Sequence, residues 1–99
     1  MNYRRLGKSG LRVSELSYGS WVTFSLQLDK QKAKNAMKHA YDSGINFFDN
    51  AEVYAAGESE KIMGDALKEL GLGRDTYTVS SKVFFGGQAV TQRGLNAKH

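Results

Sequence analysis

Three residues in the middle of the chain have the types needed to protonate a carbonyl oxygen. Asp49 ends an apolar run, Tyr54 follows five residues later, and Lys82 stands within VSSKVFF. A free tyrosine, with a pKa of about 10, is a reluctant but competent proton donor at neutral pH. A nearby ammonium favours the phenolate and lowers that pKa, while a carboxylate keeps the ammonium charged and oriented. The three groups together would form a general acid for an oxygen that gains negative charge.

Reduction of a carbonyl group also needs a hydride donor. No side chain can supply a hydride, so a nicotinamide cofactor is implied. A Rossmann site is not supported, because no G-x-G-x-x-G follows a predicted strand. The segment GLGRD follows a predicted helix and is interpreted as a helix stop. Neither a P-loop nor a metal-ligand spacing occurs, so no metal site is predicted.

Each of the three residues also has a structural interpretation. Asp49 could cap a turn, Tyr54 could be a loop aromatic, and Lys82 could be an edge lysine. Most polar residues are solvated or structural, which favours these interpretations for each residue alone. For Lys82, the apolar neighbours suggest a buried strand end, where a lone ammonium is costly without a partner. These neighbours are Val79, Val83 and Phe84.

Three further residues have chemically useful side chains. Trp21 directly follows a predicted strand end, and either packs in the core or forms one wall of a substrate or nicotinamide pocket. His39 lies mid-helix near a lysine face and is expected to be solvated. His99 is the last residue, and the sequence identifies no partner for it.

The elements that must position these residues alternate between strand and helix. A hairpin over residues 3–13 turns at Gly7–Gly10 and is followed by a short strand, Leu16–Tyr18, that ends at Gly19. Later segments are a helix from an Asp29 cap to Gly44, a strand at 45–51, a helix at 57–70, a strand at 75–85 and a loop. The end of that loop, RGLNAKH, resembles the approach to a third helix.

Both helices show an apolar face at steps of three and four residues. These faces are Ala33, Ala36, Met37, Ala40 and Tyr41 in the first, and Ile62, Met63, Ala66, Leu67 and Leu70 in the second. Alternating strands and helices predict an α/β fold with a parallel sheet. Because the carboxyl ends of parallel strands meet at one edge, Asp49, Tyr54 and Lys82 are expected to gather there.

Bulk composition narrows the functional classes. The chain has 99 residues, a net charge of +4 and no cysteine, which excludes disulfides and thiolate chemistry and is compatible with a reducing cytosol. No run reaches five like charges, so a nucleic-acid tail is not indicated. Neither a stretch of about 20 apolar residues nor a signal-peptide core occurs. A cytoplasmic protein without membrane insertion is expected.

The chain resembles the start of the aldo-keto reductases. The resemblance lies in YRRLGKSGLRVSELSYGSW, FFDNAEVYAAGESEKIMGDALK and SSKVFFGG. Three motifs are most similar to the branch that holds voltage-gated potassium channel β-subunits and their microbial oxidoreductase relatives: GSWVTF, AEVYAAG and QRGLNAKH. The resemblance to the family covers essentially the whole chain and is weaker at Thr23–Asp29.

The resemblance implies a (β/α)₈ TIM barrel with a hairpin plug, and NADPH-dependent reduction of aldehydes or ketones. The family's catalytic Asp, Tyr and Lys map onto Asp49, Tyr54 and Lys82, with Tyr54 as the proton donor. A fourth catalytic residue, His or Asn, lies on the next strand in the family. The positions that line the cofactor in the channel-subunit branch correspond to Ser20, Trp21, Gln27 and Asp49.

The chain departs from the family pattern in a few positions and in length. Asn50 replaces the usual Thr, Ser20 replaces the branch's Thr, and Ser25-Leu26 replaces Gly-Gly. About two and a half of the eight βα units are present, at 16–99, so residues 1–99 are expected to form a partial domain of an incomplete barrel. The isolated chain is expected to be inactive and not to bind NADPH measurably.

Two alternatives to a reductase stay open on the sequence. The chain could belong to a cofactor-binding regulatory module like the channel β-subunits, with a channel or a second copy as partner. It could also be a truncated, inactive product.

Overall fold

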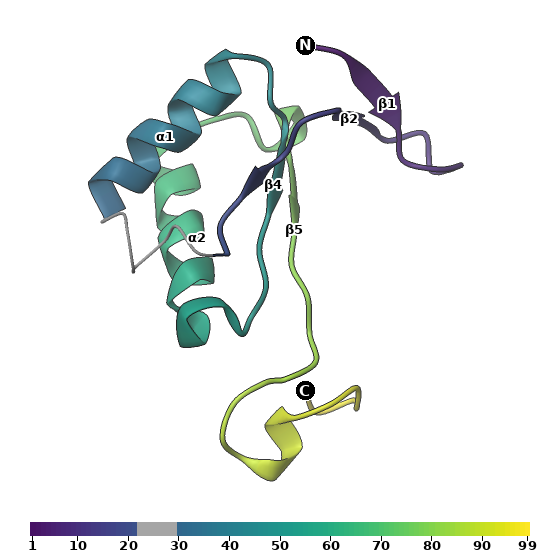
Figure 1. The fold of residues 1–99 in the computed structure, drawn as a ribbon, viewed down its shortest axis with the longest axis vertical. Coiled ribbons are helices and arrows are strands. Elements are labelled where there is room, and N and C mark those ends of the chain that lie inside the picture. Colours follow the sequence, from purple (N-terminus) through teal and green to yellow (C-terminus); the bar gives the residue numbers. More distant parts are fainter. Residues whose placement is uncertain (22–29) are drawn as a thin grey trace.

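The computed structural model describes residues 1–21 and 30–99, where short strands alternate with two long helices (Figure 1). The strands are β1 (Tyr3–Arg5), β2 (Arg12–Ser14), β3 (Tyr18–Gly19), β4 (Phe47–Asp49) and β5 (Thr78–Ser80). The helices are α1 (Lys30–Asp42) and α2 (Glu58–Leu70), and 3₁₀ turns cover Tyr54–Gly57, Arg74–Thr76 and Val90–Gln92. The α/β fold class predicted from the sequence is confirmed.

Strands β1 and β2 form the antiparallel hairpin expected at the N-terminus. Gly7 and Gly10 in its turn have φ values of 58° and 80°, which favour glycine. The hairpin is attached to the loop between α1 and β4, because the Ser14 amide donates to the Asn46 side chain at 2.8 Å and the Tyr3 hydroxyl donates to the Gly44 carbonyl at 2.7 Å. The hairpin thus lies at the end of the sheet where β4 begins, away from the carboxyl ends of the strands (Figure 1).

Strands β3, β4 and β5 form a parallel sheet in that order. The register pairs Gly19 with Asp49 and Asp49 with Ser80, so all three strands end at the same level. Both helices lie on one side of these strands in Figure 1. The predicted parallel sheet is therefore present, with its carboxyl ends aligned, and it is an open sheet.

The core lies between this sheet and the two helices. Phe48 at its centre is fully buried, with the rings of Tyr18 and Tyr77 each 6.1 Å away. The helices contribute Ala33, Met37, Met63, Ala66 and Leu67. These are members of the two predicted apolar faces, so the helical periodicity identified the packing surfaces correctly.

The basic face of α1 is partly engaged with α2. Lys30 Nζ lies 2.8 Å from a Glu69 oxygen, and Lys34 Nζ lies 3.7 Å from the other. Pairs this exposed contribute little stability, about 0–1 kcal/mol each.

All three predicted strands of the parallel sheet are shorter than expected. The middle one was predicted over 45–51 and covers Phe47–Asp49. The first begins at Tyr18 rather than Leu16, because the Ser14 hydroxyl donates to the Leu16 carbonyl at 2.5 Å and closes a bend there. The third was predicted over 75–85 but is limited to Thr78–Ser80. Arg74–Thr76 form a 3₁₀ turn in which the Thr76 hydroxyl donates to the Gly73 carbonyl.

The segment after β5 also differs from the prediction. Val83 and Phe84 were expected at a buried strand end, but both are exposed. Residues 93–98, predicted as the approach to a third helix, form bends and turns. The last segment of the chain, residues 85–99, extends beyond the carboxyl ends of the strands (Figure 1).

Candidate active site

Lys82 and Asp49 form an ion pair at the carboxyl end of the sheet. The Lys82 Nζ atom donates to both Asp49 carboxylate oxygens, at 2.9 and 2.8 Å, and to the Asn50 carbonyl at 2.8 Å. Contrary to the buried lysine expected from the sequence, the Lys82 side chain is 55% exposed, because the chain has already left the sheet at Ser80. The predicted partner is nevertheless present, and the ammonium has three acceptors.

Asp49 is held by both strands that flank it. The Ser80 hydroxyl donates to a carboxylate oxygen of Asp49 at 2.5 Å, and the Ser20 hydroxyl donates to the Asp49 carbonyl at 3.0 Å. Ser20 is fully buried. Ser80 thus orients the Asp49 carboxylate and Ser20 holds the Asp49 backbone, both independently of Lys82.

Tyr54 is presented by a tight loop between β4 and α2. The Tyr54 amide donates to the Ala51 carbonyl at 3.1 Å. Ala55 and Ala56, the next two residues, have φ values of 50° and 52°, which L-residues other than glycine rarely adopt. The Lys82 Nζ atom lies 5.3 Å from the centre of the Tyr54 ring, so the loop brings the phenol beside the ion pair.

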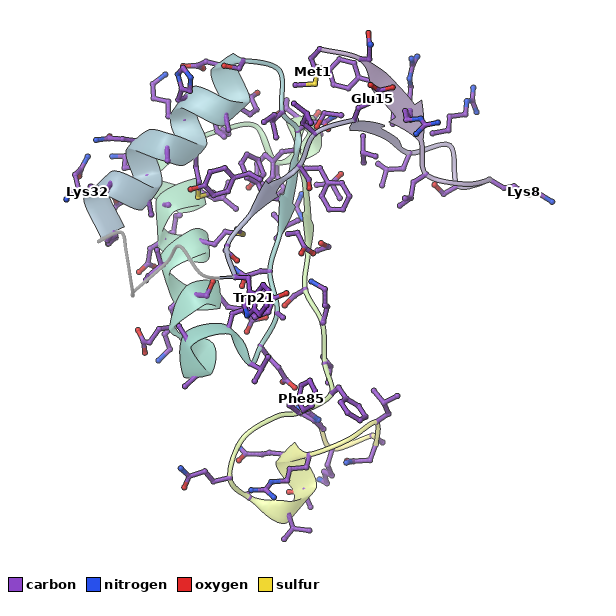
Figure 2. All side chains as sticks on the ribbon, viewed as in Figure 1. Met1, Lys8, Glu15, Trp21, Lys32 and Phe85 are labelled. Atoms are coloured by element: carbon purple, nitrogen blue, oxygen red, sulfur yellow. The ribbon has the colours of Figure 1, made fainter. Side chains whose placement is uncertain are left out.

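Trp21 lies at the same edge and is not part of the core. Its side chain is 69% exposed, and its ring centre is 6.3 Å from that of Tyr54. Figure 2 shows Trp21 near the carboxyl end of the sheet, with Phe85 further along at the start of the last segment. Of the two interpretations of Trp21, core packing is therefore wrong.

A small apolar cavity adjoins these groups. It has a volume of about 220 Å³ and is lined by Tyr54, Lys82, Phe84 and Phe85 together with Ala51–Val53. A larger hollow of about 420 Å³ lies elsewhere, along α2 and β5, and contains none of the three predicted catalytic residues. The smaller cavity is the one that brings an apolar wall next to a phenol and an ammonium.

The charges of the pair are stabilised in the folded chain. Burial alone would raise the pKa of Asp49, but the hydrogen bonds from Lys82 and Ser80 and the Lys82 charge outweigh it and lower the pKa. The hydrogen bond to Asp49 raises the pKa of Lys82 against a smaller opposing effect of desolvation, and the Tyr54 oxygen also contributes to the increase. Both groups therefore stay ionised across neutral pH.

These shifts predict how the pair contributes to stability with pH. A lowered carboxyl pKa gives stability that is present above the ordinary value of 3.8 and is lost as pH falls through the lower folded value. The raised Lys82 pKa gives stability that is present below 10.5 and is lost as pH rises above it.

We therefore expect the difference in unfolding free energy between wild type and Asp49→Asn to stay constant from about pH 5 to 9. The difference should shrink toward acid below about pH 4 and toward alkali above about pH 10. Chemical denaturation at a series of pH values measures it. A difference that declines steadily across neutral pH would contradict the assignment.

The structure also reveals a contact that the sequence did not suggest. His99, for which no partner was identified, lies against Glu52, with Nε2 2.8 Å from the Glu52 Oε2 atom. Its side chain is only 6% exposed. The usable signal in the sequence was the unexplained acid, Glu52, within the loop that carries Tyr54.

The remaining predicted residues are placed as follows. Five of them lie at the carboxyl end of the sheet: Asp49, Tyr54, Lys82, Ser20 and Trp21. The Ser20 hydroxyl is bound to the Asp49 carbonyl. Gln27 and the Asp29 helix cap lie outside the described residues. His39 is exposed, as expected.

Neither a metal-binding cluster nor a membrane-spanning helix occurs among the described residues. Over 1–21 and 30–99, no three His, Asp or Glu side chains gather in a way that could hold a metal ion. In the same part of the chain, neither helix combines the length and apolar character needed to cross a bilayer.

Comparison with known proteins gives concordant matches. Residues 15–99 match the model of the aldo/keto reductase family. The whole chain is 56% identical to a probable voltage-gated potassium channel subunit beta from Oryza sativa subsp. japonica, and 54% identical to one from Arabidopsis thaliana. In each case it spans 30% of the relative's length.

A solved structure resembles the fold directly. It is the holo form of the aldo-keto reductase AKR11C1 from Bacillus halodurans, with 37% sequence identity and a TM-score of 0.74. The match covers 89% of this chain and 28% of that protein. The fold therefore corresponds to part of a longer aldo-keto reductase chain.

Proposed function

Because the chain belongs to the aldo/keto reductase family, we propose that it carries the proton-donating part of an NADPH-dependent oxidoreductase that reduces aldehydes or ketones to alcohols. The observation that carries this proposal is the position of the Lys82 amine. It lies within 2.9 Å of both Asp49 carboxylate oxygens and 5.3 Å from the centre of the Tyr54 ring.

The three residues have distinct roles in this proposal. The Tyr54 hydroxyl gives its proton to the carbonyl oxygen of the substrate as that oxygen gains negative charge. The Lys82 ammonium stabilises the charge that remains on the phenol oxygen. Asp49 keeps Lys82 ionised and directed, while Ser80 orients the Asp49 carboxylate and Ser20 holds its backbone carbonyl. When bound, NADPH supplies the hydride, which no side chain can provide.

The described residues fit the nicotinamide end of such a cofactor. Trp21 offers an exposed flat ring close to Tyr54, and the Asp49 carboxylate is 32% exposed. The adjoining apolar cavity would shelter the reacting carbon from water. Of the four residues proposed to line the cofactor, Trp21, Gln27 and Asp49 would contact it directly. The fourth, Ser20, is fully buried and would act by holding the Asp49 backbone.

The phosphate groups of NADPH are less well provided for. Among the described residues at the carboxyl end of the sheet, Lys82 is the cation, and its ammonium is already bound by Asp49 and the Asn50 carbonyl. A dinucleotide needs several convergent groups to be held. We therefore expect residues 1–99 alone to show no measurable NADPH binding by fluorescence titration or calorimetry. Micromolar affinity would contradict this expectation.

The proposal is tested by following NADPH oxidation with the complete protein that carries residues 1–99. A panel of aldehydes and ketones should be reduced to the corresponding alcohols, identified by mass spectrometry. NADH serves as the comparison cofactor, and the isolated chain as the inactive comparison protein. Absence of turnover with every carbonyl compound, despite bound NADPH, would overturn the reductase proposal.

A second candidate follows from the two plant relatives, which are named as potassium channel β-subunits. In that case the protein would hold the cofactor, turn over slowly and associate with a channel. Co-purification with a membrane channel would support this candidate. The partners we propose first are a small carbonyl substrate and a second copy of the protein. We propose a cytoplasmic location and no nucleic-acid partner.

A further inference from the structure

Glu52 connects the loop that carries Tyr54 to the chain that follows Lys82. Its carboxylate accepts the Phe84 amide at 3.0 Å, and its own amide donates to the Lys82 carbonyl at 3.1 Å. The same carboxylate faces the His99 imidazole. Glu52 thus contacts the backbone on both sides of Val83, in addition to a residue far along the chain.

His99 has an acceptor at each ring nitrogen. The Nδ1 atom lies 2.6 Å from the Gly94 carbonyl oxygen, and Nε2 lies 2.8 Å from a Glu52 oxygen. A neutral imidazole has one N–H and could satisfy only one of these two acceptors. The geometry therefore suits the imidazolium, which donates at both positions. The hydrogen bond to the Gly94 carbonyl raises the pKa of His99, and Glu52 adds to this against the opposing effect of desolvation.

The pair of Glu52 and His99 completes a ring of hydrogen bonds beside the wall of the apolar cavity. The Gly94 amide donates to the Phe84 carbonyl at 2.7 Å, while Phe84 donates its own amide to Glu52. His99 then joins Gly94 back to Glu52. Because Phe84 is bound through both its amide and its carbonyl, the backbone of the cavity wall is fixed relative to the Tyr54 loop.

The pair is more enclosed than the ordinary surface pairs of this chain. The side chains of His99 and Glu52 are 6% and 23% exposed, against 74% and 56% for Lys61 and Glu58. Pairs of the second kind contribute almost nothing measurable. Charge-assisted hydrogen bonds in an enclosed setting are stronger and define geometry.

We propose that Glu52 and His99 form a positioning pair that fixes the wall Lys82–Phe85 against the Tyr54 loop and thereby sets the affinity for the carbonyl substrate. This inference rests on the proposed function, which it deepens by adding two residues. Glu52 is one of the residues that line the cavity, whereas His99 is not. Action through the wall therefore requires the two single variants to have the same effect.

The test uses four variants of the complete protein that carries residues 1–99. Glu52→Gln and His99→Gln each remove one partner, and the double variant removes both. A matched control, Glu58→Gln with His39→Gln, changes an exposed acid and an exposed histidine. Thermal unfolding confirms that each variant folds.

Amide hydrogen exchange in peptides covering 82–99 is measured first, because it does not depend on activity. Each single variant should exchange about tenfold faster there than wild type, and the double variant no faster than the singles. The control should exchange like wild type. Unchanged exchange in Glu52→Gln and His99→Gln, or purely additive effects in the double variant, would overturn the pairing.

Steady-state kinetics then test the link to the substrate. KM for the carbonyl compound should rise about five- to tenfold in the single variants, with kcat within about twofold of wild type. Faster exchange without a change in KM would overturn the positioning role. A wild-type protein without any reductase activity would refute the proposed function and, with it, the effect on substrate affinity, while the exchange data would still decide the pairing.

Discussion

Replacing Tyr54 with Phe should lower kcat for carbonyl reduction by about 10²–10⁴-fold, the usual contribution of a positioned general acid. The substitution removes only the phenol oxygen, so the ring can keep its position beside Trp21, 6.3 Å away between centres. Among the described residues that line the cavity, the Lys82 ammonium is then the remaining side-chain proton donor, and Asp49 already binds it.

The measurement is kcat and KM for NADPH-dependent reduction by the complete protein, with cofactor affinity determined separately. Tyr77→Phe is a matched control, because Tyr77 packs against Phe48 in the core rather than at the site. Its turnover should equal that of wild type. If Tyr54→Phe kept full turnover, Tyr54 would not be the proton donor and the assignment of the site would fail.

Replacing Lys82 with Met should have the second-largest effect, a fall in kcat of about 10²–10³-fold. The ammonium is the group that stabilises charge on the phenol oxygen, and an electrostatic contribution of this kind has that magnitude. Folding should be nearly unaffected, with a change of about 1 kcal/mol or less, because the Lys82 side chain is 55% exposed. The combination of a large kinetic and a small thermodynamic effect separates a catalytic lysine from a structural one.

A double-variant cycle with Asp49→Asn makes this prediction sharper. Asp49 acts through Lys82, whose Nζ atom lies 2.8 Å from the Asp49 Oδ2 atom. The double variant should therefore be little slower than Lys82→Met alone. Kinetic rates measured under saturating cofactor give the coupling. Fully additive losses would show that Asp49 acts on the reaction independently of Lys82.

The juxtaposition of Asp49, Tyr54 and Lys82 could be anticipated from the sequence. It follows from strand order and from the common level at which parallel strands end. The register of β4 and β5 places Asp49 opposite Ser80, two residues before Lys82. The core faces of the helices could be predicted equally well, because a helix buries residues at fixed spacing. Both inferences depend on local patterns and on one rule of topology.

What the sequence could not supply depends on the path of irregular chain. The expectation that Lys82 is buried failed because β5 ends at Ser80, and nothing in VSSKVFF marks that end. The contact between Glu52 and His99 spans 47 positions and requires the last segment to turn back on itself. The left-handed backbone at Ala55 and Ala56 could not be predicted either, because positive φ is expected at the following Gly57 and not at two alanines.

Those two alanines have a consequence for the precision of the site. Each left-handed residue costs roughly 1–2 kcal/mol relative to an ordinary conformation, so the surrounding packing must hold this turn in place. Glycine would relieve that strain, but it would also open many more backbone states to the unfolded chain. The methyl groups of Ala55 and Ala56 restrict the conformations that the turn can adopt. They thereby limit the range of positions open to the Tyr54 hydroxyl.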